Sequence, residues 1–350
     1  MGKQGDAVRN WELGFRNADL GGFGANPNSE ILIPNSKVVF MGTPQFAVPS
    51  LRALAGEPYS LTVVTQPDKP AGRGGRVTPP PVKVLAQELG LPVLQPPTLK
   101  DPDFRARLAE LQPDVTVLVA YGEYVAPSLL ELPRRSSINL HPSLLPRWRG
   151  STPIQSAILT GDEMTGVSII RMDRGLDTGP ILAQRTTPLA PGETHPQLAA
   201  RLAEMGAELL VETLPGWLRG EIEPVPQPEE GVTLTRTLSK EDGLIDWASP
   251  AEEIDRQVRA FQPWPGTYTF WEGRLLKVLR ARPIAAPEEA HSPGTIFVLQ
   301  PPGSPKSLAV STGRGALELL EVQLAGKPAI EARALLTGYP QMVGSVLGNA

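Results

Sequence analysis

Short apolar runs alternate with amphipathic helical patterns over the first part of the chain. The first apolar run covers residues 37–41, and a helical pattern follows over 46–55. Buried strands that alternate with helices form right-handed βαβ units, whose strands are parallel and whose helices cover both faces of the sheet. We therefore predict an α/β fold with a mostly parallel, doubly wound, Rossmann-like sheet domain. Further apolar runs lie at 61–65, 91–94, 115–120 and 137–140, with helical patterns between them at 82–89, 104–111 and 125–132.

Changes in composition divide the chain further. Residues 1–36 are rich in polar residues and glycine and show no helical or strand period, so we predict a disordered N-terminal extension. The Pro- and Glu-rich segment 221–231, EIEPVPQPEEG, is typical of an extended linker. The sheet domain would occupy residues 37–220, with two more strands at 167–172 and 181–185 and a closing helix at 197–218.

Residues 232–350 have a different pattern, in which one helical segment at 250–260 is followed by short strands punctuated by glycine and proline. Alternating strands of this length predict a small antiparallel β-barrel, which we describe as OB-like. The strand patterns lie at 267–271, 275–279, 294–299, 308–311 and 316–322.

The composition excludes several kinds of site. The chain has no cysteine, which excludes disulfides, thiolate nucleophiles and cysteine-based zinc sites. Its three histidines are scattered and form no His-x-x-x-His pair, so we expect no metal. No apolar stretch approaches the roughly 20 residues of a membrane span, and residues 1–36 contain no apolar secretory signal. We therefore expect a cytoplasmic protein that makes no membrane contact.

Asn139 and His141 occupy alternate positions at the end of the predicted strand 137–140. Because side chains alternate along a strand, both would point to the same face. Ligands of such sheets bind at the carboxyl ends of the strands. A lone histidine is more often structural than catalytic, but an imidazole N–H beside an amide at this place can stabilise an oxyanion. We interpret the two residues as candidate catalytic groups.

The loop 173–180, DRGLDTGP, follows a short span later and contains two aspartates, Asp173 and Asp177. An aspartate among glycines and threonine commonly forms an Asx turn. A carboxylate near an imidazole can instead orient the ring and help to move its proton. The spacing does not choose between the two aspartates.

A cationic loop at residues 69–83 contains four basic side chains and no acidic one. Such a loop is commonly a solvated surface segment. Glycines that let the backbone approach phosphates, together with arginines that pair with phosphates, also fit a nucleic-acid contact. The basic residues are Lys69, Arg73, Arg76 and Lys83, and a second basic group, Arg274, Lys277, Arg280 and Arg282, lies on a strand pattern of the predicted barrel.

Several segments resemble, in order and spacing, those of the methionyl-tRNA formyltransferases. The resemblance covers about residues 37–340, and its most specific parts are the PAGRG loop and the carboxy-terminal domain. The segments are SKVVFMGTPQFAVPSL, TQPDKPAGRGGRVTPPPVKVLA, VLVAYGEYVAP, INLHPSLLPRWRGSTPIQ and GVSIIRMDRGLDTGPIL, followed by LSKEDGLIDW, FQPWPGTY and GRLLKV.

The resemblance implies a catalytic trio of Asn139, His141 and Asp177, which chooses Asp177 over Asp173. It implies that the cationic loop, with Lys69, Arg73, Arg76 and Lys83, contacts the acceptor arm of a tRNA and that the barrel holds this tRNA. It also implies a folate-contacting loop formed by Ser143, Leu144, Leu145 and Pro146.

The implied reaction transfers the formyl group of 10-formyltetrahydrofolate to the α-amine of methionine on initiator tRNA, without a metal. The partners would be initiator Met-tRNA and the folate cosubstrate, and we expect a monomer. Two alternatives remain open. An amino-sugar or glycinamide ribonucleotide N-formyltransferase would share the trio but would have no need of the cationic loop. A non-catalytic tRNA- or folate-binding module would have no need of the trio.

Overall fold

The fold is known from a computed structural model, which describes residues 35–71, 75–286, 291–300 and 306–348. The predicted extension lies outside the described residues except for its last two positions. Of these, Ser36 is buried, and its carbonyl accepts a hydrogen bond from the Ser60 N–H. The hydrogen-bonded contacts of the sheet domain therefore include Ser36, one residue before the first predicted strand.

Seven strands form the first sheet, in the order β5-β2-β1-β6-β7-β8-β9. The pairs from β5 to β7 are parallel, whereas β8 and β9 pair antiparallel. The strand order reverses direction between β1 and β6, and in such sheets this is where ligands bind, at the carboxyl ends of the strands. The strands are β1 Lys37–Gly42, β2 Ser60–Val64, β5 Val93–Leu94, β6 Val115–Val119, β7 Ser137–His141, β8 Met164–Arg171 and β9 Ile181–Pro188.

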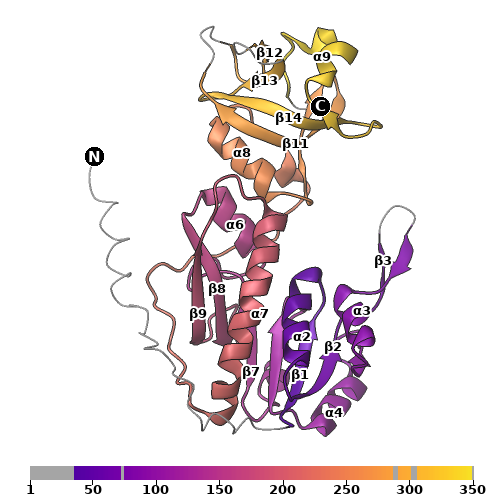
Figure 1. The fold of residues 1–350 in the computed structure, drawn as a ribbon, viewed down its shortest axis with the longest axis vertical. Coiled ribbons are helices and arrows are strands. Elements are labelled where there is room, and N and C mark those ends of the chain that lie inside the picture. Colours follow the sequence, from indigo (N-terminus) through magenta and orange to yellow (C-terminus); the bar gives the residue numbers. More distant parts are fainter. Residues whose placement is uncertain (1–34, 72–74, 287–290, 301–305, 349–350) are drawn as a thin grey trace.

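Helices cover both faces of this sheet, as predicted (Figure 1). Along β1, Val38 and Phe40 point into the core beneath α2, α3 and α7, whereas Val39 and Met41 point into the core beneath α4 and α5. Apolar residues on both sides of a strand are typical of a sheet buried on both faces. The helices are α2 Val48–Ala55, α3 Pro81–Glu88, α4 Pro102–Leu111, α5 Pro127–Leu130 and α7 His195–Arg219, with a 3-10 turn η1 at Gln45–Ala47.

The second sheet is antiparallel and has the order β10-β11-β14-β13-β12, with β15 beside β14. The C-terminal segment bonds to both edges, because Val346 bridges to Thr295 and Gly348 bridges to Phe270. These bridges close the sheet in the manner of the predicted barrel, and the OB-like topology stays a prediction. The elements are β10 Thr267–Trp271, β11 Arg274–Ile284, β12 Ile296–Leu299, β13 Ser307–Ser311, β14 Ala316–Leu324, β15 Ile330–Glu331, α8 Ala251–Ala260, α9 Ala334–Gly338, η2 Glu241–Gly243 and η3 Pro340–Met342.

Two segments differ from their predictions. The cationic loop contains a β-hairpin of β3 Lys69–Ala71 and β4 Arg76–Thr78, which projects from the body beside α3 (Figure 1). Its strands are three residues long, and the second is wholly exposed, so no alternating pattern marked it. The helix α6, Pro153–Thr160, was not predicted either, and it packs against α7 and α8.

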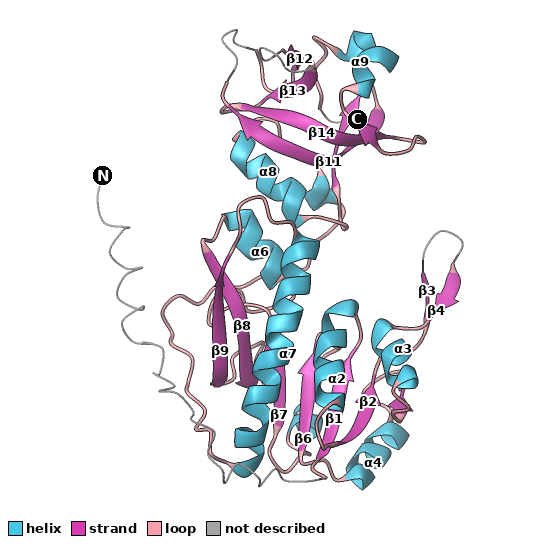
Figure 2. Ribbon diagram, viewed as in Figure 1, coloured by secondary structure: helices cyan, strands magenta, loops and turns pink. Residues whose placement is uncertain are grey.

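The segment after α7 runs back along β9 toward α6 and α8 (Figure 2). Val225 bridges to Ile181 of β9, and Leu234 bridges to Arg149 in the loop after β7. The predicted linker, residues 221–231, is therefore extended and is hydrogen-bonded to the sheet domain at Val225, and the chain bonds to this domain again at Leu234, three residues past the linker.

Candidate active site

Strand β7 places Asn139 and His141 on one face of the first sheet. The antiparallel register puts Ile170 of β8 opposite Asn139 and Ser168 opposite His141. Leu140, which lies between them, faces the other way and packs against Gly206 of α7. The contact is so close that a Cβ atom added at Gly206 would lie 2.6 Å from Cδ2 of Leu140. The two candidate residues therefore face away from α7, at the carboxyl end of β7.

The imidazole of His141 has a defined partner on each nitrogen. Its Nε2 lies 2.8 Å from the carbonyl oxygen of Trp148, and its Nδ1 lies 3.6 Å from Oδ2 of Asp177. Because a carbonyl only accepts hydrogen bonds, Nε2 carries the proton of the neutral ring. The other nitrogen then faces the carboxylate, which can stabilise a second proton on the ring. Both side chains are largely buried, at 5% and 14% exposure.

The structure distinguishes the two aspartates of the loop 173–180. Oδ1 of Asp173 accepts hydrogen bonds from the Gly175 N–H and the Thr178 hydroxyl, which makes a local Asx turn. Asp177 instead turns toward His141, and its Oδ2 accepts a hydrogen bond of 2.8 Å from the Gly150 N–H. The sequence left this choice open, and the geometry brings Asp177 and His141 together.

The loop of Ser143, Leu144, Leu145 and Pro146 lies on the same sheet face as His141. Leu145 packs against Ile170 and Ile181, and its N–H donates to the Ser168 hydroxyl. Leu144 contacts Gly166 of β8, because a Cβ atom added at Gly166 would lie 2.6 Å from Cδ2 of Leu144. The Leu145–Pro146 peptide bond is cis. These contacts fix the loop beside the His141–Asp177 pair.

Two groups of the site were missed by the sequence reasoning. One is the Trp148 carbonyl, whose position depends on a left-handed backbone with φ of 63°. The other is Gln227 of the linker, whose amide donates to the carbonyls of Asp177 and Gly179. A backbone carbonyl has no sequence signature, and a glutamine between prolines in a segment without a period gives no sign of its contacts.

The basic residues of the cationic loop differ in their surroundings. Arg76 is exposed on β4, and Arg73 lies outside the described residues. The Lys83 ammonium donates to both carboxylate oxygens of Asp68, at 2.8 Å each, and Lys69 bonds to Gln66. The hydrogen bonds from Gln95 and Lys83 hold the pKa of Asp68 below its usual value. Lys83 therefore already has an acidic partner, one residue before the loop.

The second basic group is also partly neutralised. Arg280 and Arg282 of β11 pair with Glu321 and Glu318 of the neighbouring strand β14. Arg274 lies over the rings of Trp271 and Tyr339, at 5.7 and 5.5 Å from the ring centroids. This surface carries less net positive charge than its arginines and lysine alone indicate.

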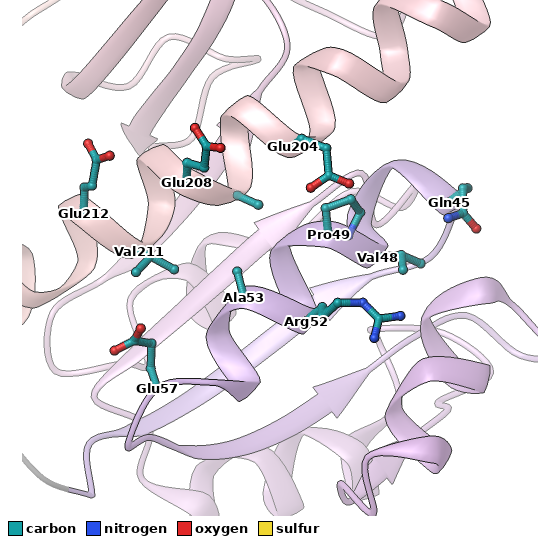
Figure 3. Close-up of a pocket in the computed structure, with 11 residues that line it drawn as sticks. Gln45, Val48, Pro49, Arg52, Ala53, Glu57, Glu204, Glu208, Val211 and Glu212 are labelled. Carbon is teal, nitrogen blue, oxygen red and sulfur yellow. The ribbon is translucent and has the colours of Figure 1, made fainter.

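A groove of about 660 Å³ lies between α2 and α7, on the sheet face opposite His141 (Figure 3). Four carboxylates stand around it, and such a surface repels a polyanion. The lining residues are Gln45, Val48, Pro49, Arg52, Ala53, Glu57, Glu204, Ala207, Glu208, Val211 and Glu212. In the described part of the chain, no group of three or more His, Asp or Glu side chains is arranged to hold a metal ion, and no helix is long and apolar enough to cross a membrane.

Known proteins share both parts of the chain. Residues 36–214 match the family Formyl transferase, and residues 237–340 match the family Formyl transferase, C-terminal domain. The methionyl-tRNA formyltransferase of Chloroflexus aggregans is 48% identical over 86% of this chain and 97% of its own length. That of Myxococcus xanthus is 48% identical over 88% of this chain and 97% of its own length.

Solved structures show the same fold at low sequence identity. An N-formyltransferase from Helicobacter canadensis, in complex with folinic acid and dTDP-3-aminofucose, has a TM-score of 0.60 at 17% identity and covers 81% of this chain and 98% of its own. HypX from Aquifex aeolicus, in complex with tetrahydrofolic acid, has a TM-score of 0.58 at 18% identity over 87% of this chain, which spans about half (48%) of HypX. With both family domains present in order and relatives 48% identical over nearly their whole length, the chain belongs to the methionyl-tRNA formyltransferases, enzymes that transfer a formyl group to methionyl-tRNA.

Proposed function

We propose that the enzyme takes the formyl group from 10-formyltetrahydrofolate and that Asn139, His141 and Asp177 are its catalytic residues. The observation that carries this proposal is the placement of His141 between the Trp148 carbonyl and Asp177 at the carboxyl end of β7. The acceptor is the α-amine of methionine on initiator tRNA. The chemistry needs no covalent enzyme intermediate and no metal ion.

The α-amine attacks the formyl carbon in its neutral form, and the carbonyl oxygen then gains negative charge. The Asn139 amide would stabilise this oxyanion, together with the Nδ1–H of His141 once that nitrogen is protonated, because the Nε2–H is directed at the Trp148 carbonyl. When the bond between the formyl carbon and N10 of the folate breaks, N10 gains a proton and the former amine loses one. Asp177 faces Nδ1 of His141 and would stabilise the imidazolium while this proton moves.

The loop of Ser143, Leu144, Leu145 and Pro146 would contact the folate. It lies on the same sheet face as His141 and is fixed to β8 through Leu145. A loop that is already ordered loses little conformational freedom when a ligand binds. This supports a preformed folate site next to the catalytic pair.

The cationic hairpin would contact the acceptor arm of the tRNA, mainly through Arg73 and Arg76. Arg76 is exposed, which supports a contact to phosphate. Lys69 and Lys83 would contribute less, because both ammonium groups already bond within the protein. The barrel would hold the rest of the tRNA.

We divide the chain into an extension (1–36), a catalytic domain (37–220), a linker (221–231) and a tRNA-binding domain (232–350).

A formylation assay tests the proposal directly. Purified protein is given 10-formyltetrahydrofolate with initiator Met-tRNA, elongator Met-tRNA, glycinamide ribonucleotide or a nucleotide-linked amino sugar. We expect rapid formylation of initiator Met-tRNA only. Faster transfer to either small amine would favour the alternative N-formyltransferases, and binding without turnover would favour a non-catalytic module. We further propose that the enzyme is cytoplasmic, because its tRNA partner is cytoplasmic. We also propose that it is a monomer, and sedimentation at working concentrations tests this oligomeric state.

A further inference from the structure

The loop that carries Asp177 needs support from outside itself. Asp177 has a left-handed backbone with φ of 52°, a conformation that residues other than glycine adopt at a cost in free energy. Such a conformation persists only where neighbouring groups fix it. The carboxylate of Asp177 faces His141 only while this backbone is kept in place.

Gln227 supplies two hydrogen bonds to this loop. Its Nε2 donates to the carbonyl oxygens of Asp177 and Gly179, at 2.7 Å each. Because an amide nitrogen carries two hydrogens, both donors are used on the loop. The two bonds fix the backbone on either side of Thr178, directly after the residue that contacts His141.

The other end of the same amide is fixed by Arg149. Oε1 of Gln227 accepts hydrogen bonds from Nε and Nη2 of Arg149, at 3.0 and 2.7 Å. A guanidinium only donates and carbonyls only accept, so the amide has one possible orientation. Gln227 therefore links the loop 177–179 to the loop after β7.

Both loops contact the catalytic pair. Trp148, which precedes Arg149, offers its carbonyl to Nε2 of His141, and Gly150, which follows Arg149, donates to Asp177. The bridge through Gln227 therefore spans the two loops that hold His141 and Asp177 at 3.6 Å.

We propose that Gln227 is a positioning residue that keeps Asp177 opposite His141, so that a linker residue determines the geometry of the catalytic pair. This inference rests on the proposed roles of His141 and Asp177. It gives the linker a part in the chemical step, in addition to joining two domains.

Two variants separate the contacts of Gln227. In Gln227→Glu, one carboxylate oxygen can still accept from Arg149, but the other faces two carbonyls without a hydrogen to donate. In Gln227→Met, the side chain keeps its length and gains no charge. The matched control is Gln257 of α8, whose Nε2 donates to the carbonyls of Asp242 and Leu244 at 2.7 and 3.1 Å. It makes the same kind of bridge far along the chain from the catalytic pair.

The experiment measures kcat, both KM values and the thermal midpoint of the full-length variants. We expect the two Gln227 variants and the corresponding Gln257→Glu and Gln257→Met variants all to melt at a lower temperature than the wild type. Only the Gln227 variants should lose kcat, by about tenfold or more, with KM for folate and for Met-tRNA within about threefold, because misplaced reacting groups slow the chemical step. Gln257→Glu and Gln257→Met should keep the wild-type kcat.

A kcat within twofold of wild type in both Gln227 variants would overturn the inference, as would equal losses at Gln227 and Gln257. If either Gln227 variant does not fold, Arg149→Lys is measured instead. The lysine keeps the positive charge but cannot donate two hydrogen bonds from a planar guanidinium to Oε1 of Gln227. We expect the same loss of kcat with nearly unchanged KM values. Full activity of His141→Ala would show that the proposed catalytic roles fail, whatever the Gln227 variants do.

Discussion

At the scale of single residues, the chemistry of the site depends on which nitrogen of His141 carries its proton. The Trp148 carbonyl requires a hydrogen on Nε2, so the nitrogen that faces Asp177 is the one that gains or loses a proton. The sequence could predict His141 because it follows a strand in a chain with three histidines. It could not predict the tautomer, because the deciding partner is a backbone atom.

Replacing His141 by alanine removes the imidazole N–H that would polarise the formyl carbonyl. We expect turnover to fall by roughly 10²-fold or more, as is usual for loss of a general acid or base. Folate affinity should stay nearly unchanged, because the proposed folate loop is fixed to β8 through Leu145 and Ser168 instead. Steady-state formylation and equilibrium titration with the folate measure the two quantities. Near-normal turnover would remove His141 from the mechanism.

Substituting the two aspartates of one loop gives an internal comparison. Asp177→Asn removes the negative charge beside His141 and should impair kcat strongly. Asp173→Asn should have a mild effect, because an asparagine oxygen can still accept from the Gly175 N–H and the Thr178 hydroxyl. Assays of both variants under the same conditions give the ranking. The reverse order would assign the catalytic role to Asp173.

At the scale of elements, burial decided what the sequence could predict. Strands such as β6 are buried at every position and therefore read as apolar runs. The hairpin strand β4 is exposed at every position and left no pattern. Helix α6 was missed although it is as long as α2 and α3 and its buried residues Ile154, Ala157 and Ile158 recur at helical spacing. The linker was predicted as extended, but its side-chain contacts depend on partners distant in sequence.

The hairpin carries the proposed contact to tRNA, and Arg73→Ala with Arg76→Ala tests it. We expect a higher apparent KM for Met-tRNA and a salt dependence of binding reduced by about one phosphate contact per arginine. Folate affinity should not change. The matched control is Arg107→Ala, an exposed arginine of α4, a helix that lies on the other side of α3 from the hairpin (Figure 1). An unchanged KM and salt slope in the double variant would indicate a solvated hairpin without a role in tRNA binding.

At the scale of the whole molecule, the two domains meet through polar contacts as well as packing. Arg256 of α8 donates to the Leu159 carbonyl of α6, and Arg259 donates to the Glu193 carbonyl before α7. Phe261, which follows α8, packs into the core of the first domain. The sequence predicted two domains and a linker, but such contacts join residues about 66 to 97 positions apart and have no local pattern.

His195 lies at the same junction and should make stability depend on pH. It is the first residue of α7, and its Nδ1 lies 2.9 Å from the Gln262 carbonyl. Burial lowers the pKa of His195 from its ordinary value of 6.5, and the hydrogen bond to Gln262 offsets this only in part. A positive charge at a helix N-terminus is also unfavourable. The folded state therefore favours the neutral ring.

The sign of the effect follows from proton binding. Below pH 6.5 the unfolded chain protonates His195 while the folded protein does not, so stability is complete above this pH and falls as the pH drops toward the lowered pKa. In His195→Asn the amide can still donate to Gln262 but does not titrate. We expect the thermal midpoint of the wild type to fall more between pH 7.5 and 5.5 than that of the variant. The wild type and the variant differ only at His195, so parallel pH curves would show that His195 does not couple protonation to the domain junction.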